Sequence, residues 1–523
     1  MLRVLQVGAA LVVLAALPYP LFQLDRYTFI KELVLLGSAL AAALLCLRRV
    51  GTVSVFVVDA LIVGYLALSL ISALLATNGW VAARAFGVSL AGAALFWAAR
   101  SAARAGLGRS LLAALAAAAV VGAGTGLIQA YGLIQTDLAS VSRAPGGTFG
   151  NRNFMAHFVT IGLPVLVMVT VEARRRRDFA IGAAGVAVAV AALVLSRSRA
   201  AWLGAAACAV FLAVEGLGVG RLWYDLRLRR RVLTLAGLGV AGLALALLLP
   251  NRLNWRSESP YLDSLAGVAN YKEGSGRGRL IQYGNTLRMA ADRPFLGVGP
   301  GNWPVHYPRY MSPADPSFDA DDIIPTNPWP SSDWIATLAE RGFPALAFLL
   351  LAGGSIGLGA WARVRRGDGR APELSDLTIV ATLIAVVVVG AFDAVVLLPA
   401  PTFLAWTAVG AMASTARPVR EIPLSASALK RTRVVTAIVG GILILHSLSQ
   451  VVAAGVANDG RRASLEVASK VDRGSYRIHM LLAQQWRKAG RCDRARAEAD
   501  RAHRLFPNHP APRVITRACR RSG

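Results

Sequence analysis

The 523-residue chain is poor in the residue types that build metal and redox centres. It has only four cysteines and six histidines, and they do not stand at the spacings of a metal site. Cys46 and Cys208 lie in apolar runs, where cysteine usually acts as a small core residue. Cys492 and Cys519 lie in a polar tail and could pair in an oxidising compartment. The sequence therefore predicts no bound metal and no cofactor.

Charged residues are also scarce, at 16% of the chain, and they are unevenly divided. The 56 Lys and Arg outnumber the 29 Asp and Glu, which gives a formal net charge of +27. In a soluble protein this excess would suggest nucleic-acid binding. Here 55% of the residues are hydrophobic and the mean hydropathy is +0.52, so a membrane explanation competes. Basic residues accumulate in the cytoplasmic loops of membrane proteins, and a nucleic-acid partner is not needed.

Hydropathy predicts an all-α, polytopic membrane bundle of about 12 to 13 spans. The apolar cores lie at 5–21, 33–47, 53–76, 81–99, 111–134, 154–171, 179–195, 202–219, 232–249, 343–360, 377–398, 403–416 and 434–454. The first run resembles a signal peptide, but no clear cleavage site follows it, so we interpret it as a span. The cores divide the chain into N-terminal helices (1–249), a large loop (250–342), C-terminal helices (343–457) and a tail (458–523).

Alternate connections between these spans are rich in arginine. The basic connections lie at 48–49, 100–109, 174–177, 221–231, 363–370 and 417–433. The opposite connections are poor in Lys and Arg, and those at 77–80 and 398–402 have none. This bias predicts a cytoplasmic N-terminus, with the large loop and the tail on the other side of the membrane.

Several arginines fall at the predicted outer ends of the spans or in the large loop. An arginine is always charged and offers a planar fork of donors, which suits the oxygens of a diphosphate. Such a cluster could anchor a diphosphate and stabilise it as a leaving group. Snorkelling at the interface or pairing with an acid is the alternative for any single arginine. The residues are Arg84, Arg143, Arg152, Arg199, Arg277 and Arg279.

Glycine-rich and acidic segments allow a structural and a functional interpretation. The segment 297–301 contains Pro300 and no clear strand precedes it, so it predicts a tight turn rather than a nucleotide site. The segment 146–153 is an anion nest or, more commonly, a helix cap. Asp393, inside a span, is expected to pair with an arginine. The loop acids Asp319, Asp321 and Asp322 are more typical of solvated residues than of a metal site.

The tail has a helical pattern with small residues at regular intervals. Small residues let two antiparallel helices approach, an aromatic residue fills the space between them, and proline ends the second. A tetratricopeptide repeat and a simple helical hairpin explain the pattern equally well, and a further helix is expected at 461–471. A lone repeat cannot bury its own face, so we expect it to pack on another surface. The residues in question are Ala483, Trp486, Gly490, Ala495, Ala502 and Pro507.

Five motifs follow one another in order between residues 146 and 360. They lie at 147–154, 198–202, 279–283, 293–302 and 338–342. Together they resemble the O-antigen ligase and polymerase superfamily of bacterial inner-membrane glycan transferases, some members of which carry a similar tail. The resemblance implies a metal-independent transfer of a glycan from undecaprenyl diphosphate to an acceptor at the periplasmic face. In ligases the acceptor is lipid A–core.

The resemblance also implies roles for particular residues. Arg199 and Arg279 match the family arginines that hold the donor diphosphate, and Arg277 and Arg152 are further candidates nearby. The family histidine lies eight or nine residues before the Glu of a Glu-x-Gly motif, a place taken here by Ser331 and Ser332. Since transfer needs a group to accept the acceptor's proton, Asp333 and His306 are the replacement candidates.

Three functions remain open at this point. The first is an enzyme, for which ligation, polymerisation and transfer to protein share one architecture. The second is a non-catalytic scaffold that recruits polysaccharide-assembly proteins through its tail, which the absence of the histidine favours. The third is a transporter, for which paired broken helices or inverted repeats would be diagnostic, and no convincing pair is evident.

Overall fold

The computed structural model is built almost entirely of helices, which confirms the predicted all-α class. It describes residues 1–19, 25–48, 51–133, 144–218, 225–255, 257–267, 274–311, 315, 323, 329–366, 373–415 and 418–521. Arg143, Asp319, Asp321 and Asp322 lie outside the described residues. Within them, the strands β1 (Thr52–Val55) and β2 (Arg420–Pro423) form one antiparallel pair.

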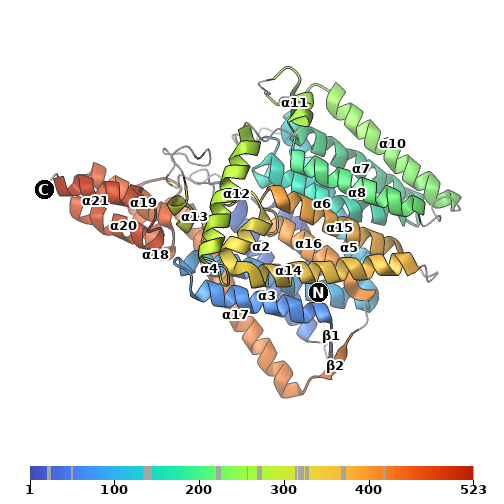
Figure 1. Ribbon diagram of the computed structural model, residues 1–523, viewed down its shortest axis with the longest axis horizontal. Coiled ribbons are helices and arrows are strands. Elements are labelled where there is room, and N and C mark those ends of the chain that lie inside the picture. Colours follow the sequence, from blue (N-terminus) through green and yellow to red (C-terminus); the bar gives the residue numbers. More distant parts are fainter. Residues whose placement is uncertain are drawn as a thin grey trace.

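The long helices form a bundle, shown in Figure 1, and each predicted apolar core overlaps one of them. Nine helical segments of the described chain are long and apolar enough to cross a membrane, and one of them, Gly79–Tyr131, combines α4, a π-helical turn and α5. The polytopic prediction is therefore confirmed. The helices are α1 (Leu2–Leu14), α2 (Asp25–Leu47), α3 (Val57–Leu74), α4 (Gly79–Ala102), α5 (Gly108–Tyr131), α6 (Arg152–Val171), α7 (Arg176–Ser196), α8 (Arg199–Gly218), α10 (Leu226–Leu248), α14 (Asp333–Arg366), α15 (Glu373–Phe392), α16 (Pro399–Met412) and α17 (Ala426–Ala457).

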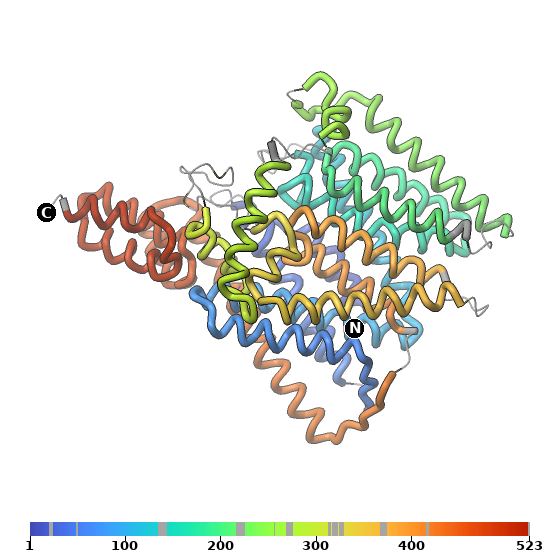
Figure 2. The backbone as a smooth tube through the Cα atoms, viewed as in Figure 1, coloured from blue at the N-terminus to red at the C-terminus, as the bar shows by residue number. Residues whose placement is uncertain are grey.

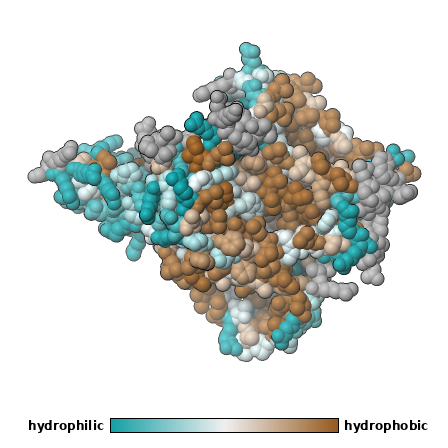
Figure 3. All heavy atoms as spheres, viewed as in Figure 1, coloured by the Kyte–Doolittle hydropathy of each residue, from teal (hydrophilic) through white to brown (hydrophobic). Residues whose placement is uncertain are grey.

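The outer surface of the bundle is apolar. Leu74, Leu248 and Leu445 are 76%, 80% and 66% exposed, and Figure 3 shows a broad hydrophobic surface over the helices beside a hydrophilic tail. Such a surface would associate in water, whereas hydrocarbon accommodates it. These faces therefore suit a lipid environment.

Helix α6 lies at the centre of the bundle. It packs against α5, α7, α8, α15 and α16, and 78% of its most apolar 18-residue stretch is buried. Small residues permit such close packing in a membrane, where van der Waals contact rather than hydrophobic exclusion holds helices together. Because its first turn faces the large loop, α6 connects the interior of the bundle to that loop.

The large loop folds into the helices α11 (Pro260–Ala266), α12 (Gly274–Asp292) and α13 (Trp303–His306). Helices α12 and α13 pack on α14, whereas α11 contacts Arg197 and Arg199 near the start of α8. The predicted tight turn is confirmed, since Gly297, Gly299 and Gly301 all have positive φ angles of 65°, 105° and 66°. Its Val298 N–H donates to Ala339 O at 2.9 Å, so the turn docks on the Glu-x-Gly motif.

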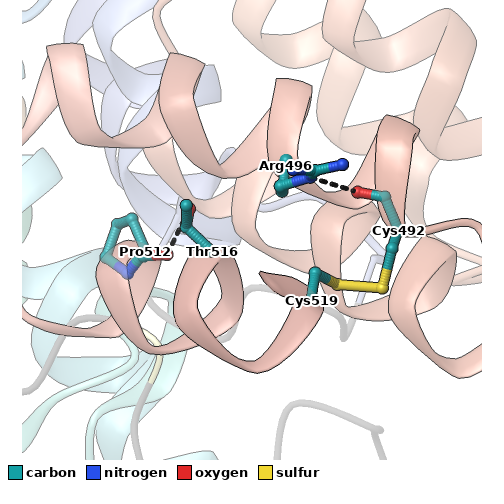
Figure 4. Close-up of a disulfide and its surroundings, with 5 residues drawn as sticks. All are labelled: Cys492, Arg496, Pro512, Thr516 and Cys519. Atoms are coloured by element: carbon teal, nitrogen blue, oxygen red, sulfur yellow. Dashed lines mark hydrogen bonds between the residues drawn. A yellow bond between two sulfur atoms is a disulfide. The ribbon is translucent and has the colours of Figure 1, made fainter. Parts of the chain in front are cut away.

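The tail consists of four helices at one end of the molecule, which Figure 2 shows as a separate arm: α18 (Arg462–Val471), α19 (Tyr476–Lys488), α20 (Cys492–Leu505) and α21 (Ala511–Arg521). Ala483, Ala495 and Ala502 are fully buried between the helices, as the hairpin prediction requires, and Gly490 turns the chain with φ of 72°. The assignment to tetratricopeptide repeats stays a prediction. A disulfide between Cys492 and Cys519 links α20 to α21 (Figure 4).

Candidate functional site

The candidate site begins at the first turn of α6. The amide groups of Gly146 and Gly147 donate to Gln129 Oε1 at 2.7 and 2.8 Å, and Asn151 Oδ1 accepts the Asn153 N–H at 2.9 Å. Because these donors already have protein acceptors, the structure favours the interpretation of 146–153 as a cap over an anion nest. The motif therefore positions α6.

One turn further along α6, His157 lies in the interior. Its side chain is 1% exposed and its Nε2 lies 3.4 Å from Ser198 Oγ, at the start of α8. Among the described residues, its Nδ1 has no hydrogen-bond partner. Arg279 and Asp393 are the charged groups close enough to act on this imidazole. His157 therefore lies beside Ser198, within electrostatic reach of an acid and an arginine.

Asp393 lies where α15 ends. The expected salt bridge to an arginine is absent from the described residues; instead Asp393 Oδ2 accepts from Asn153 Nδ2 at 3.4 Å, and Oδ1 accepts the Ala394 N–H. The reason is geometric, because α15 has already ended and the side chain faces the first turn of α6. Asp393 thus accepts one backbone hydrogen bond and one long side-chain hydrogen bond, and it lies within electrostatic reach of His157.

The four predicted diphosphate-binding arginines occupy different environments. Arg199 donates to the carbonyl of Gly267, at the end of α11, and Arg279 is half-buried near His157. Arg277 is exposed on α12, and the Arg152 guanidinium lies 5.2 Å from the ring centroid of Trp255. Arg199 is therefore held at the end of α11, Arg279 lies within electrostatic reach of His157, and Arg152 is held against an aromatic ring.

Ser331 and Ser332, which stand at the place of the family histidine, are fixed by hydrogen bonds. Tyr283 Oη lies 2.7 Å from the carbonyl oxygens of both Ser331 and Ala391. Gln282 Oε1 accepts the Ser331 N–H at 2.6 Å, and Ser332 Oγ donates to Gly390 O at 3.2 Å. Helix α12 and the end of α15 thus fix this segment next to Arg279, which lies one helical turn before Tyr283.

The candidate base Asp333 has its carboxylate engaged by the backbone. It is fully buried, and it accepts the N–H groups of Val395 and Val396 at 2.9 to 3.0 Å. Two charge-assisted hydrogen bonds stabilise the carboxylate and hold the connection between α15 and α16. This environment favours a positioning role, and the role of base stays a prediction.

The candidate base His306 lies at the junction of the loop, the tail and the connection between α3 and α4. Its Nε2 lies 3.0 Å from Thr77 Oγ1. Burial lowers the pKa of His306 to about 4, and Arg293 and Arg309 act in the same direction. His306 is therefore neutral at pH 7 and able to accept a proton, but its surroundings differ from those of Arg279.

His157 is the residue that sequence analysis missed. It stands four residues after Asn153, so both side chains lie on one face of α6. A polar residue inside an apolar run, in register with a motif asparagine, was the signal that could have identified it. Within the described residues, three or more His, Cys, Asp or Glu side chains do not cluster as a metal site would require.

Comparison with known proteins supports the resemblance. Residues 184–350, about a third of the chain, match the sequence model of a family described as O-antigen ligase. This segment contains the motifs at 198–202, 279–283, 293–302 and 338–342, whereas α6 and Asp393 lie outside it. No curated protein matches the chain significantly. The matched family suggests glycan transfer as a general activity. The matched segment runs from α7 to the middle of α14.

Proposed function

From the match of residues 184–350 to the O-antigen ligase family model, we propose that the chain transfers a glycan from a polyprenyl-diphosphate carrier to an acceptor hydroxyl. The carrier is undecaprenyl diphosphate, and the reaction takes place at the periplasmic face of the bacterial inner membrane. The observation on which the proposal rests is the contact of His157 with Ser198, the neighbour of Arg199, within electrostatic reach of Arg279 and Asp393.

Two observations support the proposed orientation. The basic connections alternate with connections that are poor in Lys and Arg, which favours a cytoplasmic N-terminus. The disulfide between Cys492 and Cys519 suits a tail on the periplasmic side, because the cytosol keeps thiols reduced. The loop helix α12 and the tail therefore share the periplasmic side in this proposal.

Arg199 and Arg279 bind the donor diphosphate, with Arg277 and Arg152 at its edge. Their charges stabilise the negative charge that develops on the diphosphate as the glycosidic bond breaks. The electron pair of that bond leaves with the diphosphate oxygen, while the acceptor oxygen forms a new bond to the anomeric carbon. The proton of the acceptor hydroxyl then passes to a base of the protein.

We assign the role of base to His157, with Asp393 beside it. A neutral imidazole can accept a proton, and a nearby carboxylate stabilises the imidazolium that forms. Its orphan Nδ1 and its proximity to Arg279 favour it over His306, which contacts Thr77. Asp333 holds the backbone that carries Asp393 in place.

The acceptor is lipid A–core or another glycan, and polymerisation and transfer to protein use the same chemistry. Membrane lipid surrounds the bundle, and the tail is available to polysaccharide-assembly proteins. The specific observation that favours a non-catalytic scaffold instead is Ser331 at the place of the family histidine. A transfer assay in liposomes distinguishes an enzyme from a scaffold.

The test is reconstitution of the purified chain in liposomes with a polyprenyl-diphosphate glycan and a panel of acceptors. Arg199→Ala and Arg279→Ala are each expected to lower the transfer rate about 100-fold, because each removes a guanidinium that would stabilise the leaving diphosphate. Arg496→Ala, an exposed arginine of the tail, is the matched control and should transfer normally. Normal product from both site variants would refute the diphosphate assignment, and absence of product from wild type with every acceptor would favour the scaffold.

A further inference from the structure

A cavity of about 160 Å³ lies between the tail and the bundle. Helices α2, α4, α14 and α17 form its floor, and the tail residues Tyr476, Arg477 and Phe506 form its roof. Trp329 also lines it, and the Trp329 ring lies 5.8 Å from that of Phe154 on α6, next to the candidate site. The cavity therefore adjoins the proposed reaction centre.

The strongest charges around this cavity are already compensated. Arg84 forms a bidentate pair with Glu32 at 2.7 Å, and Arg477 pairs with Asp25 across the contact between tail and bundle. Arg341 Nη1 lies 3.5 Å from Glu340 Oε2. Because each arginine has an acid beside it, the cavity offers no net charge that would select an anion.

Two buried polar atoms at this cavity nevertheless have no partner among the described residues. The donor is Arg341 Nε and the acceptor is Gln450 Oε1. The side chains of Arg341 and Gln450 are 0% and 3% exposed. Buried polar atoms are normally satisfied, so these two atoms point to a ligand or to ordered water.

The chemistry of these atoms selects a class of ligand. Donors and acceptors are mixed, which is complementary to hydroxyl groups, since a hydroxyl both donates and accepts. The rings of Trp80, Trp329 and Tyr476 offer apolar surface of the kind that a sugar ring presents on its C–H faces. The volume lies below the roughly 300 to 1,000 Å³ of pockets for drug-sized molecules, which suits a single small ring.

We propose that this cavity binds one neutral sugar unit, and that the tail forms part of the substrate-binding site. The identity of that sugar as part of the transferred or accepting glycan rests on the proposed function. The binding itself rests only on the cavity. In this arrangement the tail covers the sugar, with Gln450 Oε1 accepting from one of its hydroxyls and Arg341 Nε donating to another.

Binding can be measured without turnover. The full chain in lipid nanodiscs is titrated with methyl glycosides of neutral hexoses and N-acetylhexosamines, and saturation-transfer NMR reports contact. Gln450→Leu removes an acceptor, and Ala85→Phe fills the cavity without removing a polar group. Each is expected to weaken binding at least about tenfold. Gln485→Leu is the matched control, because Gln485 lies on α19 away from the cavity and should leave binding unchanged.

Saturable binding that Gln450→Leu and Ala85→Phe lose and Gln485→Leu keeps would support the sugar site. Absence of saturable binding with every glycoside, or equal binding by all three variants, would overturn it and show that the cavity holds water only. These results are independent of the transfer assay. Sugar binding by a chain that transfers nothing would refute the proposed function alone, while transfer that Ala85→Phe leaves intact would refute the sugar site alone.

Discussion

At the residue scale, His157 is the group that we propose in place of the family histidine, whose position is taken here by Ser331. A buried histidine in a membrane helix needs polar neighbours, and here Ser198 lies beside His157 while Asn153, one turn earlier on α6, donates to Asp393. The family arrangement puts its histidine on the loop before α14. In this chain the imidazole instead approaches Arg279 from α6.

This placement predicts the behaviour of two histidine variants. His157→Gln should lower the rate of glycan transfer by about 100-fold or more, because positioned acid–base groups contribute about 10² to 10⁴. His306→Gln, the matched control, should stay within about threefold of wild type. Initial rates in the liposome assay measure both, with size-exclusion profiles confirming that each variant folds.

The reverse pattern, in which His306→Gln is inactive and His157→Gln is normal, would assign the base to His306. Wild-type activity of both variants would leave Asp333 as the candidate base. Asp333→Asn would then be the next substitution. The double variant His157→Gln, Ser331→His adds a rescue test, since Ser331 is anchored beside Arg279.

At the element scale, the break in α14 joins the large loop to the bundle. Gly342 has φ of 82°, and it interrupts a helix that otherwise continues from Asp333 to Arg366. Phe343 N–H donates to Pro294 O at 2.7 Å, so the chain on both sides of the break contacts the turn before α13. Glycine is required here because the backbone is left-handed and because a Cβ would overlap the carbonyl group of Phe295.

Gly342→Ala should therefore destabilise the protein by about 1 to 3 kcal/mol or more, since it adds a strained backbone to a steric overlap. Gly353→Ala on the same helix is the control, because its added Cβ meets no described atom within 4 Å. Alanine there should be neutral or stabilising by up to about 1 kcal/mol. Unfolding temperatures in detergent measure both, and equal temperatures would refute the proposed constraint.

At the scale of the whole molecule, the tail docks on the bundle through a charged interface. Asp472 lies there, facing Arg84 of α4 and Asp25 of α2, and Arg477 pairs with Asp25. Burial raises the pKa of Asp472 to about 6, although the Arg84 charge opposes the shift. The docked tail therefore binds a proton more tightly than a detached tail does.

This interface should weaken as the pH rises. The contribution of Asp472 is complete below about pH 4, where a free aspartate is protonated, and it is lost as the pH passes through about 6. Hydrogen exchange of α18 and α19, corrected for intrinsic rates, should therefore be slower at pH 5 than at pH 7.5. Asp472→Asn should remove most of that difference and the exposed control Asp500→Asn should keep it. If Asp472→Asn leaves the difference in exchange between pH 5 and pH 7.5 unchanged, another titrating group causes that difference.

Several features of the fold follow from local pattern alone. Lipid requires every backbone polar group of a span to be satisfied within its own helix, so each apolar run of sufficient length predicts one helix. The tail hairpin also followed from local pattern, since its small residues Ala483, Ala495 and Ala502 are buried as expected. The turn at Gly297 was also predictable, because glycine tolerates a conformation that other residues avoid.

The site depended on contacts that local pattern does not encode. His157 meets Ser198 across 41 residues, Asn153 meets Asp393 across 240, and Arg477 meets Asp25 across 452. Hydropathy shows that such residues lie in or beside a span, but the rotation of each helix and its neighbours decide which side chains meet. The expected partner of Asp393 was wrong for this reason.

The sequence by itself determined that this chain is a helical membrane protein with family motifs in order, because spans and turns are local properties. Only the tertiary structure decided that His157 meets Ser198, that Asp333 holds a backbone connection, and that the tail covers a cavity beside Trp329. Those are relations between distant segments, and their geometry is set by how the helices pack.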